Sequence, residues 1–132
     1  MTTFDLIFRY YAAFNRADWD DMLALVSDDV AHDLNQGERQ IGREAFRAFL
    51  ARMARSYLEV LTDVRILVSS DGSHAAAEYI VSGQYLSSDV GLPIASGQRY
   101  RLPGGAFFDI RDGRISRISN YYNLNDWIAQ VS

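Results

Sequence analysis

The chain has 132 residues and no cysteine, and its 13 basic and 17 acidic side chains give a net charge of −4. A chain of this length forms one domain, residues 1–132, and buries enough apolar surface to fold without a disulfide or a structural metal. The acidic balance argues against binding to nucleic acid or to an anionic membrane. Every basic residue is an arginine, which excludes lysine Schiff-base chemistry, and the lack of cysteine excludes a thiol nucleophile.

No stretch of the chain has the pattern of a secretory signal or of a membrane-spanning helix. We therefore expect a cytoplasmic protein. The two histidines, His32 and His74, lie far apart in the sequence, which argues against a dedicated zinc site. We expect neither a metal nor a cofactor.

The first half of the chain has the spacing of helices. Apolar residues recur every three or four positions from Phe4 to Phe14, which predicts a helix with one buried stripe. Asp18 is a typical N-cap for a second helix, and Gly42 precedes a third apolar helical face. The expected order is helix 4–14, helix 19–26, turn 27–29, strand 30–35, polar loop 36–40 and helix 42–56.

The second half is rich in β-branched and aromatic residues. Asp-Gly pairs at 71–72 and 112–113 stand between strand-like runs, and this pattern is typical of β-hairpins. The expected elements are strands 57–70, 74–86, 98–110 and 114–123, a loop at 87–97 and a helix at 126–131. Helices followed by an antiparallel meander predict an α+β fold. Three helices on one face of a curled sheet form a cone-shaped pocket.

Two segments carry a resemblance to a known family. Residues 9–29, from Arg9-Tyr10 through Asn15 to Asp28-Asp29, follow the first two helices of the ketosteroid isomerases. Asp33 stands nine positions before Gly42, the spacing at which those enzymes have their catalytic aspartate. The chain thus resembles the nuclear transport factor 2-like superfamily, which also contains SnoaL-like polyketide cyclases, epoxide hydrolases and non-enzymatic binding modules.

The resemblance implies that Asp33 is the general base, facing an apolar cavity that raises its pKa. On a regular strand His32 points to the opposite face, so direct cooperation between the two needs a bulge. Tyr10 matches the tyrosine that donates to the substrate oxygen. The remaining residues expected around the substrate are Asn120, Tyr122, Ala106, Phe108, Ile118, Phe14 and Trp19.

One position departs from the isomerase pattern. Ala106 stands where those enzymes have an aspartic acid that stays protonated near neutral pH and donates a hydrogen bond. Half of their oxyanion site is therefore missing, and Asn120 or Tyr122 is expected to replace the donor. We expect a cofactor-independent isomerase or cyclase acting on a small apolar carbonyl compound. The alternatives are a non-catalytic binding or dimerisation module and an epoxide hydrolase.

The predicted strand at 74–86 carries apolar residues at both odd-numbered and even-numbered positions, which point to opposite faces of a strand. Both faces of such a strand are expected to be covered. Because related isomerases pair through the outer face of the sheet, we expect a homodimer. The loop at 87–97 is expected either to cover the pocket or to extend the dimer contact.

Overall fold

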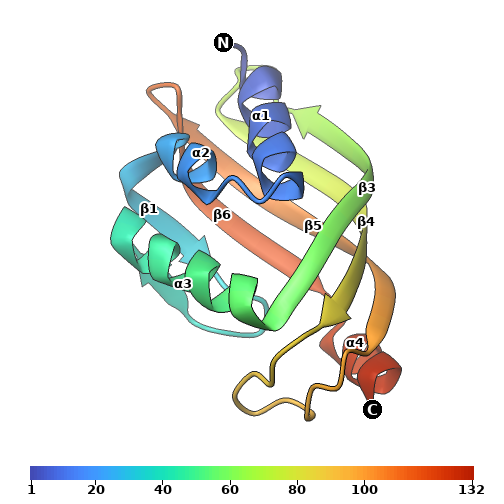
Figure 1. Ribbon diagram of the computed structural model, residues 1–132. Helices are drawn as coiled ribbons and strands as arrows, with labels where there is room; N and C mark the ends of the chain where they lie inside the picture. Colours follow the sequence, from blue (N-terminus) through green and yellow to red (C-terminus); the bar gives the residue numbers. More distant parts are fainter.

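The computed structural model describes all residues from 1 to 132, in four helices and six strands (Figure 1). In chain order these are α1 (Thr3–Asn15), α2 (Trp19–Ala24), β1 (Val26–Asp33), β2 (Arg39–Ile41), α3 (Arg43–Ser56), β3 (Tyr57–Val68), β4 (His74–Tyr85), β5 (Arg99–Arg111), β6 (Arg114–Tyr122) and α4 (Leu124–Val131).

The helix starts follow local capping chemistry. Thr2 and Asp5 form a reciprocal capping box at the start of α1, and the Asp18 side chain accepts from the Asp21 N–H at the start of α2. Asn123 caps α4 in the same way. Gly42 precedes α3 with a φ of 105°, a conformation that favours glycine. The expected starts of the second and third helices are confirmed.

The six strands form one open sheet in the order β2-β1-β6-β5-β4-β3. All neighbours are antiparallel except β1 and β6, which are parallel. The two Asp-Gly hairpins form as predicted, and both Asp112 and Gly113 have positive φ, as the tightest hairpin turns require. The α+β fold with a mostly antiparallel sheet is confirmed.

Two boundaries near the site differ from the expectation. β1 begins at Val26, so the expected turn at 27–29 is strand. The expected polar loop contains the short strand β2, in which Arg39 pairs with Asp33 and Ile41 with Ala31. Both differences have the same cause, because pairing with β6 on one side and β2 on the other supplies the hydrogen bonds that the local sequence does not predict.

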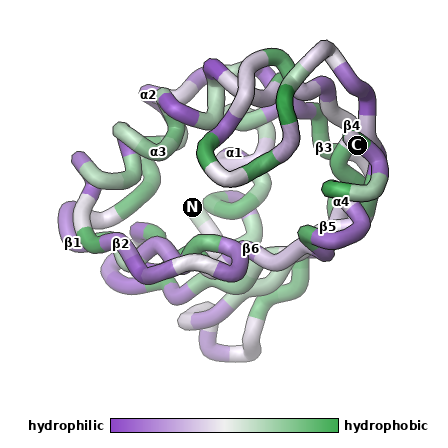
Figure 2. The backbone as a smooth tube through the Cα atoms, turned by 90° about the horizontal axis from the view of Figure 1, so that it is seen from below, coloured by the Kyte–Doolittle hydropathy of each residue, from purple (hydrophilic) through white to green (hydrophobic).

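The helices α1, α2 and α3 cover one face of the sheet, which curls around them (Figure 1). The view from below shows α2 and α3 facing β6 and β5 across the interior (Figure 2). The main core lies between these layers, and a smaller core of Tyr85, Tyr100, Leu102, Trp127 and Val131 lies beside α4. No helix has the length and apolar character needed to cross a membrane.

Candidate ligand-binding and active site

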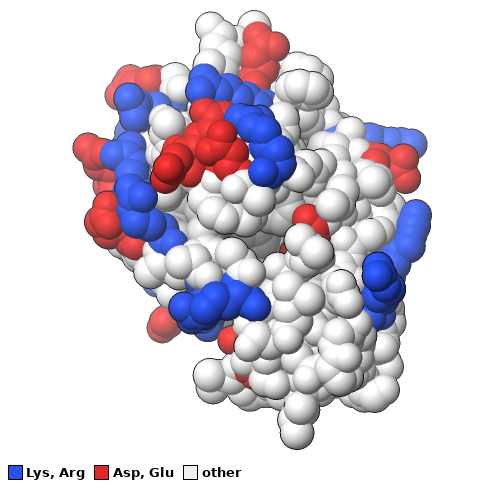
Figure 3. All heavy atoms as spheres, in the orientation of Figure 1, with Lys and Arg blue, Asp and Glu red and all other residues white.

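A cavity of about 510 Å³ lies between the helices and the inner face of the sheet. Of its 30 lining residues, 22 are hydrophobic. Its volume is in the range of small-molecule sites, and a mostly apolar wall with a few polar groups is typical of them. Figure 3 shows a hollow near the centre of this face, framed mostly by uncharged side chains, while charged groups gather over the N-terminal helices.

Five of the predicted site residues line this cavity. They are Tyr10, Phe14, Trp19, Asn120 and Tyr122. Burial raises the pKa of the Tyr10 phenol well above its usual value, so its hydroxyl is protonated near neutral pH. Tyr10 therefore has the protonation state of a hydrogen-bond donor, as expected.

Three predicted lining residues are covered instead. Ala106, Phe108 and Ile118 belong to the main core, and none is more than 1% exposed. The rings of Tyr10 and Tyr11 pack edge-on over Phe108, with centroids 5.7 and 6.0 Å away. The prediction that these residues face inward was right, but their side chains are packed within the main core, where Tyr10 and Tyr11 of α1 cover Phe108.

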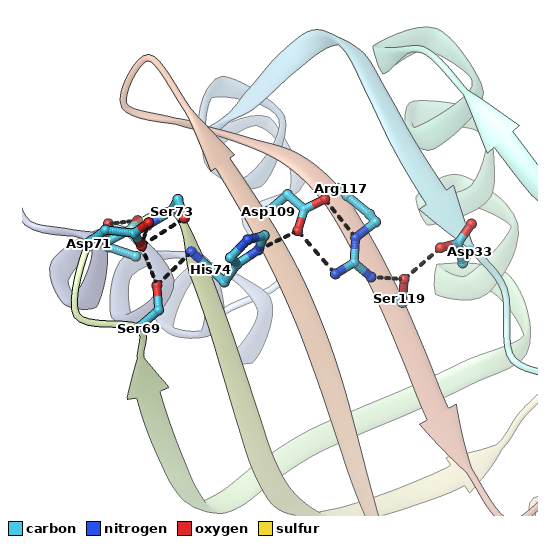
Figure 4. Close-up of polar contacts among 10 residues, drawn as sticks. Asp33, Ser69, Asp71, Ser73, His74, Asp109, Arg117 and Ser119 are labelled. Atoms are coloured by element: carbon cyan, nitrogen blue, oxygen red, sulfur yellow. Dashed lines mark hydrogen bonds and ion pairs between the residues drawn. The ribbon is translucent and has the colours of Figure 1, made fainter.

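The predicted position of Asp33 inside the cone is wrong. Asp33 projects from the outer face of the sheet, where Arg39 donates to both carboxylate oxygens at 2.6 and 3.0 Å. The Ser119 hydroxyl donates to the same carboxylate at 2.6 Å. A row of polar groups continues from Ser119 through Arg117 and Asp109 to His74, crossing from β1 to β4 (Figure 4).

These contacts remove the basicity that the isomerase comparison assigns to Asp33. Hydrogen bonds from the Arg39 guanidinium, with a smaller contribution from Ser119, lower the pKa of Asp33 to about 2. Asp33 also lies outside the cavity lining, so it cannot exchange a proton with a ligand held inside. Alternation along β1 explains the error, because a residue next to one inside the cone must point outward.

The residue inside the cone is His32. It is 1% exposed and lies between two rings of α3, with centroids 5.0 Å from Phe46 and 4.5 Å from Phe49. Its Nε2 lies 3.2 Å from the Asn120 amide nitrogen. Its other ring nitrogen, Nδ1, is buried without a hydrogen-bond partner, although buried polar atoms are usually paired.

Burial lowers the pKa of His32 to about 4, against a smaller opposing effect of the Asp33 charge. The imidazole is therefore neutral at pH 7. When Nε2 accepts from the Asn120 amide, as the amide is oriented here, the ring proton is on Nδ1. In this tautomer the free Nδ1–H can donate to a ligand, and when the amide is turned so that its oxygen accepts from Nε2–H, Nδ1 can accept from one.

A carboxylate that the sequence analysis missed also lines the cavity. Glu59 projects inward from β3 and accepts a hydrogen bond of 2.6 Å from the Tyr100 hydroxyl. Burial raises the pKa of Glu59, partly opposed by this hydrogen bond. In the sheet, Gly83 stands between the two residues, pairing with Glu59 on one side and Tyr100 on the other.

The glycine allows this contact. A Cβ at Gly83 would lie 2.3 Å from the Tyr100 ring, so only glycine lets the ring cross the strand to reach Glu59. Glycine inside a strand marks such close approaches, and this was the one available signal for the pair. Predicting it needed the strand register, which the sequence alone does not give.

A third polar group lies where the loop 86–98 meets the cavity. The Tyr57 hydroxyl donates to Asp89 at 2.8 Å, and an Arg52 guanidinium nitrogen is 3.9 Å from the same carboxylate. Asp89 and Leu92 from this loop line the cavity, whereas Val90 and Ile94 are exposed. The loop thus forms part of the cavity wall.

The SnoaL-like domain family model matches residues 7–118. The chain belongs to the SnoaL-like domain family. This confirms the resemblance to the nuclear transport factor 2-like superfamily. No curated protein matches the chain.

Several solved structures have sequences that are highly identical to this chain. A candidate polyketide cyclase from Pseudomonas putida KT2440 is 56% identical, with a TM-score of 0.99 over 100% of this chain and 99% of that one. A second candidate polyketide cyclase, from Xanthomonas campestris pv. campestris, is 58% identical, with a TM-score of 0.95 over 98% and 96% of the two chains. A candidate ketosteroid isomerase from Kribbella flavida DSM 17836, at 24% identity and a TM-score of 0.68 over 92% and 77%, shares the fold.

Proposed function

We propose that this SnoaL-like protein is a cofactor-independent enzyme of the cyclase or isomerase type. It moves a proton on a small, mostly apolar carbonyl compound held in the cavity. The observation that supports the proposal best is the buried His32 imidazole, with one nitrogen next to Asn120 and the other without a partner, inside an apolar cavity. The relatives described as polyketide cyclases agree with this class of chemistry.

In this proposal His32 replaces Asp33 as the group that exchanges a proton with the substrate. For proton abstraction, Nε2–H donates to the Asn120 side-chain oxygen, with the amide turned from the orientation described above, and the lone pair of the unpartnered Nδ1 accepts the substrate proton. Tyr10 is a protonated phenol in the same cavity, so it is a candidate donor to the substrate oxygen as negative charge develops there. A low-dielectric surrounding strengthens both interactions.

An epoxide hydrolase is the second candidate. Such an enzyme uses paired carboxylates and an arginine to activate water, and the sequence analysis identified no second acid facing Asp33. Two other carboxylates, Glu59 and Asp89, line the cavity, and Arg52 lies 3.9 Å from Asp89. Hydrolysis of styrene oxide that is lost in Asp89→Asn but retained in His32→Gln favours this candidate.

Proton exchange tests the main proposal without knowledge of the natural substrate. The protein is incubated in D2O with a panel of cyclic and aromatic ketones, including 1-tetralone and 5-androstene-3,17-dione. Deuterium incorporation next to the carbonyl is followed by NMR. Incorporation above the buffer rate for at least one ketone supports the proposal. Binding without exchange across the panel contradicts it and indicates a non-catalytic binding module.

A further inference from the structure

The cavity contains two separate polar positions, one on each side of the boundary between β6 and β5 in the sheet. One is formed by His32 and Asn120, on β1 and β6. The other is Glu59 of β3, whose carboxylate is held by the hydroxyl of Tyr100, a residue of β5 in the smaller core behind the cavity wall. The proposed proton transfer uses the first position and leaves the second without a function.

The sheet register shows that the two positions are well separated. Asn120 pairs with Ala106 of β5, whereas the row through Glu59 and Gly83 reaches β5 at Tyr100. Ala106 and Tyr100 are six residues apart on β5, which corresponds to about 20 Å along a strand. The direct distance across the hollow of a curled sheet is shorter. A single carbonyl group therefore cannot contact both positions.

Glu59 is an acceptor without a cationic partner. Its Oε2 is taken by the Tyr100 hydroxyl, and no other hydrogen bond or ion pair reaches the carboxylate. Glu59 is partly buried, and a carboxylate in an apolar cavity loses part of its hydration unless it gains a partner. The Tyr100 ring, which crosses Gly83, fixes the direction of the carboxylate. The charge of Glu59 contributes to the raised pKa values of three tyrosines, Tyr79, Tyr100 and Tyr122.

We propose that Glu59 and Tyr100 form a subsite for a hydrogen-bond donor on the substrate, a hydroxyl or an ammonium group. The substrate class is then an elongated carbonyl compound with an apolar body and a donor group distant from the carbonyl. The donor supplies the partner that Glu59 lacks, and the aromatic wall contacts the body. This inference rests on the proposed function and narrows its substrate class.

A matched set of rigid ketones tests the subsite by isothermal titration calorimetry. The probes are 4-acetylbiphenyl and its 4′-hydroxy, 4′-methoxy and 4′-aminomethyl derivatives. A hydrogen bond to a charged acceptor predicts that the hydroxy probe binds the wild type on the order of tenfold or more tightly than the methoxy probe. A still tighter aminomethyl probe identifies the donor as ammonium.

Variants locate the effect. Glu59→Gln is expected to reduce the preference for the donor probes to about threefold or less. The matched control is Glu78→Gln, which changes an exposed glutamate on the outer side of β4 paired with Arg65 and is expected to keep the preference. Tyr100→Phe, which retains the carboxylate but removes the donor that positions it, is expected to be intermediate.

The wild type provides an independent measurement if a variant does not fold. Protonation of Glu59 turns its carboxyl into a donor, so the preference for hydroxy over methoxy is expected to fall as pH is lowered. The tyrosines around it have raised pKa values and stay protonated over this range.

Equal binding of all probes to the wild type, or a preference that persists in Glu59→Gln, overturns the subsite. Either result leaves the proton transfer at His32 intact, because that chemistry is measured by deuterium exchange. Failure of every probe to bind contradicts both the subsite and the use of the cavity for carbonyl compounds.

Discussion

His32 and Asp33 are adjacent in the chain and project to opposite faces of β1. The first is buried between Phe46 and Phe49 inside the cavity, and the second is paired with Arg39 outside it. Their pKa values move below the usual ones for different reasons, burial for His32 and the arginine for Asp33. Only the inner residue can meet a ligand in the cavity, so the proposed chemistry belongs to His32.

Removing the charge of Asp33 is expected to affect stability more than ligand binding. Asp33→Asn weakens the ion pair with Arg39 and the hydrogen bond from Ser119, and the Asp33 side chain is 30% exposed. A partly exposed pair of this kind contributes about 1 kcal/mol. Urea unfolding is expected to show that loss, with ketone binding within twofold of wild type. A tenfold loss of binding at full stability would place Asp33 in the site after all.

The stability of the fold is expected to depend on pH through His32. Its pKa is about 4 in the folded protein and near 6.5 when unfolded, so the unfolded state binds the additional proton between these values. The stability from keeping the ring neutral is complete above about pH 6.5 and is lost as pH falls toward 4. The 2.5-unit difference corresponds to on the order of 3 kcal/mol.

Chemical denaturation from pH 7.5 to 4 measures this dependence. The variant His32→Gln is the comparison, because it keeps a polar side chain but cannot titrate. The wild type is expected to lose stability over this range and the variant to lose much less. Equal slopes for the two proteins contradict burial of a neutral imidazole.

Below about pH 4, the pH dependence of stability is expected to come from a different group, Asp33. The pKa of Asp33 is held at about 2 by Arg39, below its ordinary value of 3.8. The stability from this depression is present above about pH 3.8 and is lost as pH falls toward 2. Asp33→Asn is expected to flatten the wild-type curve there, whereas the change between pH 6.5 and 4 persists and becomes slightly larger, because the Asp33 charge opposes the lowering of the His32 pKa. A variant that also flattens the upper range contradicts the separation of the two groups.

We expect a homodimer through the outer face of the sheet. Leu67, Phe107 and Tyr121 are 60%, 50% and 55% exposed, and the last two rings pack edge-on on this face. Phe107→Glu is expected to yield a monomer in sedimentation velocity at micromolar concentration. Phe8→Glu changes an equally exposed phenylalanine on α1 and is expected to leave the dimer intact. A monomeric wild type contradicts this prediction.

The fold could be predicted from the sequence because its signals are local. Apolar spacing, the caps at Asp18 and Asn123 and the Asp-Gly hairpin at 112–113 each depend on a few neighbouring residues. The hairpin alignment placed Asn120 and Tyr122 on the inner side of β6, the family resemblance pointed to Tyr10, and all three residues line the cavity.

The polar groups of the site could not be predicted in the same way. The prediction of which β1 residues face the cavity was based on the spacing of Asp33 to Gly42. That spacing does not show which face of β1 is the inner one when β2 adds a strand at the edge of the sheet. Glu59 meets Tyr100 only because three strands align at Gly83. Such contacts depend on the register of distant segments, which no local pattern encodes.

The central claim is that His32, rather than Asp33, exchanges a proton with the substrate. Deuterium incorporation into the most reactive ketone of the panel is measured for the wild type, His32→Gln and Asp33→Asn under identical conditions. We expect a loss of at least about 100-fold in His32→Gln, the scale of general acid–base catalysis, and a rate within about threefold of wild type in Asp33→Asn. A wild-type rate in His32→Gln with a large loss in Asp33→Asn would contradict it.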